Sequence, residues 1–207
     1  MERLVVNPTN PEAGAIAAAA EILRAGGVVA FPTDTLYGLA VDPRRSDAVE
    51  RLFRLKGRDA ASAIPLIADS LAQASAAATF GARERRAAET FWPGPLSIVA
   101  AANPCVSANA LGGGGSVAIR VPAHSVATEL ARAFGFPVTA TSANRSGERA
   151  TDLADDVASN LPEVDLLLDA GRAPGGAPST IIAFDVDGPV LVRAGAIAWE
   201  RVIKSLQ

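Results

Sequence analysis

Residues 28–39 read Val-Val-Ala-Phe-Pro-Thr-Asp-Thr-Leu-Tyr-Gly-Leu, and the fold can be worked out from this stretch. Residues 28–31 form a short apolar run behind Gly26-Gly27, which predicts a buried strand. The strand leads into a polar loop over residues 32–39, whose hydroxyls and carboxylate could orient a small polar ligand at a sheet edge. Threonine and aspartate also favour ordinary turns, so the loop alone leaves both interpretations open.

Helices are expected on both sides of this strand and loop. Asn10-Pro11-Glu12 predicts the start of a helix that runs to about Arg24, because it combines a capping residue, a proline at the first helical position and an acid in the first turn. After the loop, Ser46 predicts the cap of a second helix, which runs through Arg54 and ends at Gly57.

The remainder of the chain alternates short strands with helices. Strands are predicted at 64–68, 96–101, 117–121, 138–141, 164–168, 180–186 and 190–193, and helices at 70–77, 82–91 and 125–134, from Thr151-Asp152 onward, and at the end of the chain. The elements do not form clean βαβ units, so the pattern predicts an α/β fold with a mixed sheet. The sequence contains no repeat or linker, and one domain is expected over residues 1–207.

Composition narrows the classes of function. The chain has 207 residues and a net charge of −3, so any nucleic-acid binding would need a local basic patch. With Cys105 and His124 as the only residues of their kinds, neither an internal disulfide nor a four-ligand structural zinc site is expected. A Ser-His-Asp hydrolase would need His124 as its base, and no G-x-S-x-G motif accompanies it. The absence of a leader-like or membrane-length apolar segment predicts a cytoplasmic protein without membrane contact.

Three further polar segments follow apolar elements. Lys56-Gly57-Arg58 is either a phosphate clamp or a pair of cations that complement a helix dipole, and charge alone favours neither. Ser142-Ala143-Asn144 suits phosphate or ribose oxygens, or else a loop that satisfies its own backbone. Arg120 ends an apolar strand and needs a carboxylate partner, which is either a ligand's or a protein's, such as that of Asp34 or Glu129.

Seven motifs in sequence order make a more specific pattern than any single segment. They are FPTDTLYGL (31–39), KGR (56–58), WPGP (92–95), VAIRVPAH (117–124), SAN (142–144), PST (178–180) and LVR (191–193). Together they resemble the YrdC/Sua5 family over about residues 12–195. The family's members are similar to threonylcarbamoyl-AMP synthases, which supply the activated group for the threonylcarbamoyl modification of adenosine 37 in certain tRNAs. Because the chain ends soon after Arg193, it resembles the short, single-domain form.

The resemblance implies a twisted, open α/β fold with a concave basic face, and it assigns roles by position. Lys56 and Arg58 match a catalytic clamp on ATP phosphates. The other implied ATP contacts are Ser142, Asn144, Ala150 and Arg193, and the implied threonine contacts are Thr33, Thr35, Arg120, Ala140 and Ser179. The implied cofactor is Mg²⁺ with ATP. The implied partners are ATP, L-threonine and bicarbonate, and then tRNA or the transferase complex that uses the adenylate.

Three departures from the family pattern affect details of the site, one of which is that residues 58–64 are richer in alanine than usual. Asp59 and Thr141 stand where many members have proline, so the loops beside residues 56–58 and 142–144 need not follow the usual course. Two other functions remain open. One is a non-enzymatic RNA-binding module, although only Phe53 lies among Arg51, Arg54, Lys56 and Arg58 to stack on bases. The other is a paralogue that uses a different carbamoyl-type substrate.

Overall fold

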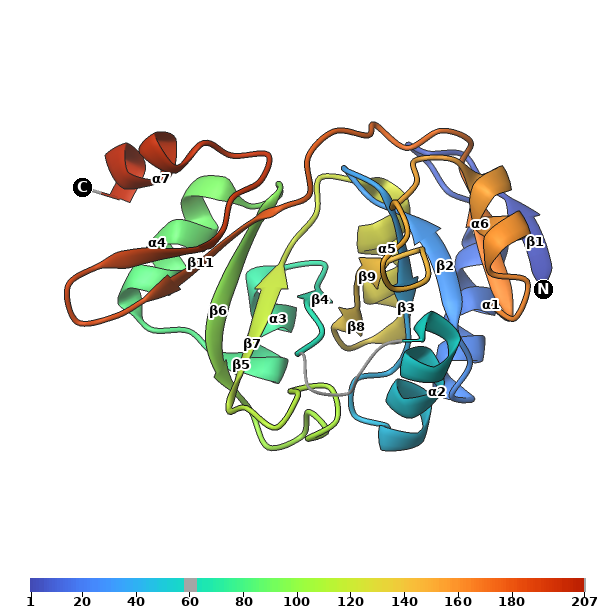
Figure 1. Cartoon of the computed structure of the whole chain (residues 1–207), viewed down its shortest axis with the longest axis horizontal. Coiled ribbons are helices and arrows are strands. Elements are labelled where there is room, and N and C mark those ends of the chain that lie inside the picture. The colour runs from blue at the N-terminus through green and yellow to red at the C-terminus, as the bar shows by residue number, and fades with distance from the viewer. Residues whose placement is uncertain (58–62, 207) are drawn as a thin grey trace.

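A computed structural model describes residues 1–57 and 63–206 of the chain. Arg58, which the resemblance places in the phosphate clamp, and Asp59, which departs from the family pattern, lie outside the described residues. The described chain is a mixed α/β fold whose strands form two sheets lying side by side, with helices around them (Figure 1). The expected fold class is confirmed.

The first sheet holds the strand that the opening sequence stretch predicts. Its five strands are β1 (Glu2–Val5), β2 (Val29–Pro32), β3 (Tyr37–Ala40), β9 (Thr141–Ser142) and β10 (Leu166–Asp169). They lie in the order β1-β10-β2-β3-β9, where β1, β10 and β2 are parallel and β3 and β9 are antiparallel to their neighbours. All four residues of β2 are buried, as expected for a strand inside a sheet covered on both faces.

The second sheet is built from the middle and the end of the chain. Its strands are β4 (Leu66–Ile67), β5 (Ala78–Thr79), β6 (Leu96–Ala102), β7 (Ser116–Arg120), β8 (Val138–Thr139), β11 (Thr180–Phe184) and β12 (Pro189–Arg193). The main order is β12-β11-β6-β7-β4-β8, and β5 pairs with β6. Strands β8 and β9 are separated by Ala140 alone, so the chain passes from one sheet to the other at that residue.

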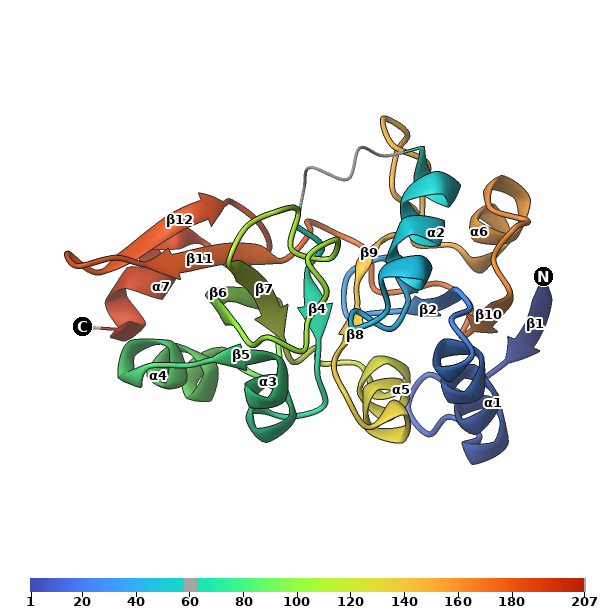
Figure 2. The same ribbon diagram turned by 90° about the horizontal axis from the view of Figure 1, so that it is seen from below.

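The helices are α1 (Ala13–Arg24), α2 (Ser46–Lys56), α3 (Leu71–Ala77), α4 (Ala82–Phe91), α5 (Ser125–Phe134), α6 (Ala154–Asn160) and α7 (Trp199–Leu206). Figure 2 shows α1 and α5 on one side of the five-stranded sheet and α2 and α6 on the other. Helices α3, α4 and α7 lie beside the seven-stranded sheet. The helices cover the sheets. The buried residues of both sheets and of the helices form one continuous core.

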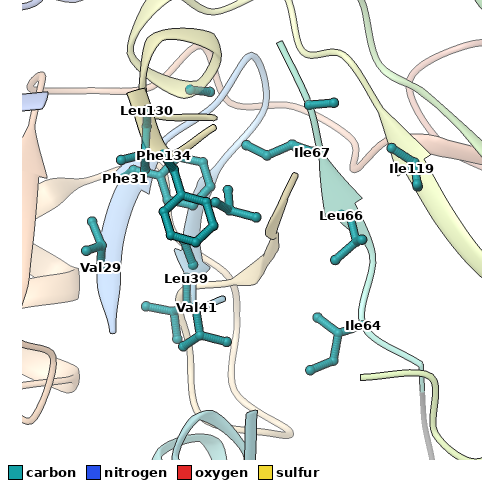
Figure 3. Close-up of a cluster of buried hydrophobic side chains, with 14 of the residues drawn as sticks. Val29, Phe31, Leu39, Val41, Ile64, Leu66, Ile67, Ile119, Leu130 and Phe134 are labelled. Carbon is teal, nitrogen blue, oxygen red and sulfur yellow. The ribbon is translucent and has the colours of Figure 1, made fainter. Parts of the chain in front are cut away.

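The core between the sheets is made of branched and aromatic side chains. Figure 3 shows Phe31, Leu39 and Leu130 on the side of the five-stranded sheet, facing Leu66 and Ile67 of β4. All five are fully buried. Phe31 pairs with Gly38 across β2 and β3, and a Cβ built at that glycine would lie 3.3 Å from the ring. The glycine therefore leaves room for the aromatic side chain.

Locally encoded elements agree with the sequence prediction. Helices α4 and α5 have the predicted bounds, and Gly57 and Gly135 end α2 and α5 with φ angles of 60° and 82°. Such left-handed angles favour glycine. Ser70 caps α3 by accepting a hydrogen bond from the backbone N–H of Gln73.

Several predicted boundaries are wrong, and for three of them the contacts give the reason. Helix α1 begins at Ala13, because the side chain of Asn7 accepts bonds from Thr9 and Asn10 and holds residues 7–10 in a turn. Helix α6 begins at Ala154, because Thr151 likewise forms a local turn by accepting from the N–H of Leu153. The predicted loop over residues 32–39 contains strand β3, whose backbone pairs with β2.

Candidate functional site

A cavity of about 570 Å³ lies where the two sheets meet. Both sheets contribute to its wall, together with the loops after β9 and before β11. Its lining includes most of the residues that the sequence assigns to ligands, namely Thr33, Thr35, Arg120, Ala140, Ser142, Asn144, Ala150, Ser179 and Arg193. The structure therefore brings together residues that are more than a hundred positions apart in the sequence.

One wall is the four-residue turn between β2 and β3. The hydroxyl of Thr33 donates to the carbonyl of Leu36 at 2.8 Å and accepts from the backbone N–H of Thr35 at 3.1 Å. Both threonines are buried and line the cavity. The interpretation as a hydrogen-bonded turn is therefore confirmed, and the interpretation as a ligand-binding loop stays a prediction, since both threonines line a space that could hold a ligand.

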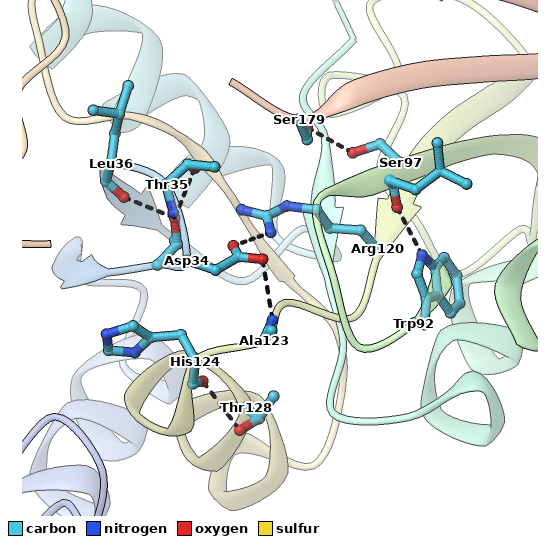
Figure 4. A network of polar contacts seen from close by, with 12 residues as sticks. Asp34, Thr35, Leu36, Trp92, Ser97, Arg120, Ala123, His124, Thr128 and Ser179 are labelled. Carbon is cyan, nitrogen blue, oxygen red and sulfur yellow. Dashed lines mark hydrogen bonds and ion pairs between the residues drawn. The ribbon is translucent and has the colours of Figure 1, made fainter. Parts of the chain in front are cut away.

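Arg120, at the end of β7, reaches this wall from the other sheet. Its Nη1 forms an ion pair with Asp34, and both side chains are about nine-tenths buried, with relative exposures of 8%. Figure 4 shows the guanidinium beside Asp34 and Thr35. Of the two protein partners considered for Arg120, Asp34 is confirmed and Glu129 is wrong, because Glu129 pairs with Arg132.

The opposite wall carries a chain of hydroxyls and a second arginine. Arg193 donates from Nη2 to the carbonyl of Ser179 at 2.8 Å and to its hydroxyl at 3.1 Å. The Ser179 hydroxyl lies 2.9 Å from that of Ser97, which is buried at the start of β6 and also lines the cavity (Figure 4). Burial, and then the nearby charge of Arg120, lower the pKa of Arg193. The sequence prediction missed Ser97, whose only signal is one hydroxyl in an apolar strand.

Gly195 holds the Ser179 wall in place by close backbone packing. A Cβ at this position would lie 2.5 Å from Ser179 C and from Thr180 N, and closer still to the carbonyl of Pro178. Gly195→Ala is therefore expected to push this segment aside, to destabilise the protein by about 1–3 kcal/mol and to weaken ligand binding at Ser179. Thermal unfolding and threonine titration measure both effects. Gly14→Ala, a helical glycine with nothing within 4 Å of the added Cβ, is the control. Equal behaviour of the two variants would contradict the prediction.

The third wall is the loop after β9, whose backbone carbonyls accept hydrogen bonds from Lys56. Its Nζ donates to the carbonyl of Ser142 at 2.5 Å and to that of Asn144 at 2.8 Å. Asn144 in turn donates to the carbonyl of Glu148 at 2.8 Å. Lys56 is buried, with a relative exposure of 4%, although it ends α2. Its position at the end of a helix therefore does not leave the side chain in solvent.

Ala140 and Ala150 complete the lining on this side. Ala140 lies at the crossing between the sheets, and its N–H donates to the carbonyl of Pro65 at 2.8 Å. Side chains this small leave space in the cavity, and the ligand contacts that the family resemblance implies for them stay a prediction. Thr141, one of the three departures from the family pattern, lies in β9 and pairs with Leu39.

Neither His124 nor Cys105 is among the described residues that line the cavity. His124 precedes α5, its Nδ1 is buried without a hydrogen-bond partner in the described chain, and burial lowers its pKa. Cys105 is exposed. The described wall of the cavity contains hydroxyls, an amide, backbone groups, two arginines and one carboxylate, that of Glu148. The arginines and hydrogen-bond donors suit binding of anions better than nucleophilic attack by the protein.

The Sua5/YciO/YrdC family model, which is described by the words "Telomere recombination", matches residues 21–195. The chain belongs to the YrdC/Sua5 family. Threonylcarbamoyl-AMP synthase of Bacillus subtilis is 35% identical over 190 residues, which are 90% of this chain and 55% of that protein. The enzyme of the same name from Pyrococcus abyssi is 36% identical over 188 residues, again 90% of this chain and 55% of the relative. The chain thus spans about half the length of these curated relatives.

Solved structures of YrdC/Sua5 proteins agree with this assignment. P. abyssi Sua5 complexed with L-threonine superposes with a TM-score of 0.91 at 34% identity, covering 98% of this chain and 60% of that one. E. coli YciO superposes with a TM-score of 0.87 at 27% identity and covers both chains fully. The two-sheet arrangement described above is therefore the fold of this family. None of the helices in the described part of the chain has the length and apolar character needed to cross a membrane.

Proposed function

We propose that the chain forms threonylcarbamoyl-AMP and pyrophosphate from L-threonine, bicarbonate or CO₂, and ATP. The observation that carries the proposal is the cavity between the sheets, where buried Arg120 and several hydroxyls face a loop that Lys56 orders. Support comes from relatives that are named threonylcarbamoyl-AMP synthases and from the similarity to Sua5 complexed with L-threonine.

The proposed reaction needs no protein nucleophile, which fits a cavity whose described lining includes neither His124 nor Cys105. The amine of threonine combines with bicarbonate to give a carbamate and water. A carbamate oxygen then attacks the α-phosphorus of ATP, and the bond to the bridging oxygen breaks as its electron pair leaves with pyrophosphate. This makes the proposed enzyme a nucleotidyltransferase. The protein has to hold two anions close together and stabilise charge on the phosphates, which fixed cations and hydrogen-bond donors do.

Each wall has a part in this scheme. Arg120 would bind the threonine carboxylate, while Thr33, Thr35 and Ser179 surround the rest of the amino acid. The loop with Ser142 and Asn144 would bind the nucleotide together with Ala150 and Arg193. Lys56 would act on the phosphates directly or through this loop, and Arg58 would complete the clamp.

Mg²⁺ is proposed to enter with ATP. The described residues include no group of three or more histidines, cysteines or carboxylates that could hold a metal ion. Glu148 is the carboxylate among the described residues that line the cavity. One carboxylate together with phosphate oxygens is a common magnesium environment, so the lining fits an ion that the nucleotide largely holds itself. When bound, Mg²⁺ would neutralise charge on the phosphates. Transfer of the product to tRNA by a separate complex remains part of the proposal.

We expect pyrophosphate release from ATP to require threonine and bicarbonate together. The reason is that the attacking oxygen exists only on the carbamate that the two form. A coupled pyrophosphate assay, with each component omitted in turn and with other amino acids in place of threonine, measures the dependence. Release that is unchanged without threonine would contradict the proposal. Activity with another amino acid alone would indicate a paralogue, and salt-dependent RNA binding without any release would indicate a binding module.

A further inference from the structure

Asp34 joins the two sheets at the cavity without belonging to its wall. Thr33 and Thr35 on either side of it are among the described residues that line the cavity, whereas Asp34 is not. Its carboxylate turns the other way, where one oxygen pairs with Arg120 and the other accepts from the backbone N–H of Ala123 at 3.1 Å. A residue that follows β2 thereby fixes the end of β7 and the turn after it.

The ion pair uses only one corner of the Arg120 guanidinium. Nη1 donates to Asp34, and within the described chain Nε and Nη2 have no protein acceptor. Because Arg120 lines the cavity, these remaining donors are available to a ligand there. A guanidinium binds a carboxylate through two parallel N–H groups, and the Nε–Nη2 edge has that geometry.

The charge of Asp34 also lets two arginines share one cavity. Arg120 and Arg193 both line it, and their mutual effect is visible in the pKa of Arg193, which the charge of Arg120 helps to lower. Without a carboxylate beside Arg120, the charges of the buried Arg120 and the more exposed Arg193 would repel each other, and the flexible guanidinium of Arg120 would turn away or toward solvent. Asp34 prevents both movements.

We propose that Asp34 is a positioning residue that presents the Nε–Nη2 edge of Arg120 to the carboxylate of the amino-acid substrate. The proposal rests on the proposed function, since it needs an amino acid in the cavity. It makes the internal ion pair part of the binding site instead of an alternative to it. Asp34 is not a catalytic residue, because it acts through Arg120.

The test is Asp34→Asn, measured by calorimetric titration with threonine and with ATP and by thermal unfolding. Asparagine is similar in size and can still accept from Ala123, but it lacks the charge that orients Arg120. We expect threonine binding to weaken about tenfold, the strength of one charge-assisted hydrogen bond, while ATP binding changes less than about twofold.

Asp42→Asn is the matched control. Asp42 is equally buried and pairs with Arg44 at 2.9 Å, but it is not among the described residues that line the cavity. It should lower the melting temperature without changing either affinity. Asp34→Asn in an Arg120→Lys background should change threonine affinity little, since the positioned edge is already absent.

Each outcome decides the proposal. Equal losses for threonine and ATP, or an unchanged threonine affinity in folded Asp34→Asn, would overturn it. If Asp34→Asn does not fold, Asp34→Glu keeps the charge and moves the carboxylate by one methylene. That variant should still weaken threonine binding severalfold, and wild-type affinity would overturn the positioning role. A wild-type protein that binds no threonine would instead overturn the proposed function together with this inference.

Discussion

Lys56→Met is expected to reduce kcat/KM for ATP by about ten- to a hundredfold, the equivalent of roughly 1.5–3 kcal/mol for a charge-assisted contact. Methionine keeps the length of the buried stem but cannot donate to the carbonyls of Ser142 and Asn144. These carbonyls then lose a donor in a poorly solvated place, so the loop that is proposed to bind the nucleotide should move. We expect the melting temperature to fall as well, because Lys56 is buried.

Lys204→Met is the control for this change. Lys204 is the only other lysine of the chain and is exposed in α7. Steady-state kinetics with ATP varied, together with thermal unfolding of both variants, give the comparison. If Lys56→Met lost stability but kept its kcat/KM for ATP, Lys56 would have a purely structural role.

Arg120→Lys is expected to raise the threonine KM by about ten- to a hundredfold while leaving the ATP KM nearly unchanged. An ammonium can keep a contact with Asp34, but it cannot offer two parallel donors to a carboxylate at the same time. The apolar neighbours of Arg120 in β7 make any loss of its partners costly, so some loss of stability should accompany the kinetic effect.

Arg44→Lys separates stability from substrate binding. Arg44 also pairs with a buried carboxylate, that of Asp42, and lies outside the lining of the cavity as the structure describes it. It should lose stability without changing the threonine KM. A lower melting temperature with an unchanged threonine KM in Arg120→Lys would assign Arg120 to the ion pair with Asp34 alone.

The sequence predicted those parts of the fold that are decided locally. Helices α4 and α5 have the predicted bounds, because their periodicity and the glycine after α5 act within one segment. Strand β3 was missed, because Tyr37–Ala40 becomes a strand only through pairing with β2. The run over residues 138–141 reads as one strand, and its division at Ala140 depends on partners in two different sheets.

The candidate site shows the same limit. The motifs that resemble the YrdC/Sua5 family identified residues that the cavity brings together, and this required no knowledge of distances. Ser97 could not be identified, since its hydroxyl gains a partner only when Ser179, 82 positions later, folds against it. For Arg120 the sequence left a choice between a protein carboxylate and the carboxylate of a ligand. In the structure Nη1 pairs with Asp34, and the other donors of the guanidinium remain for a ligand, so the two partners do not exclude each other.

The pairing of strands that lie far apart in the sequence has a consequence for biosynthesis. Strand β1 pairs with β10, so residues 2–5 cannot pair in the sheet until residues 166–169 have left the ribosome. Strand β6 likewise gains its partner β11 only after residue 180 has been made. Pairings of such long sequence separation close large loops and form late. Neither half of the molecule can therefore mature as an early co-translational unit, and a nascent chain shorter than about residue 195, where Gly195 packs on the Ser179 wall, has no finished cavity.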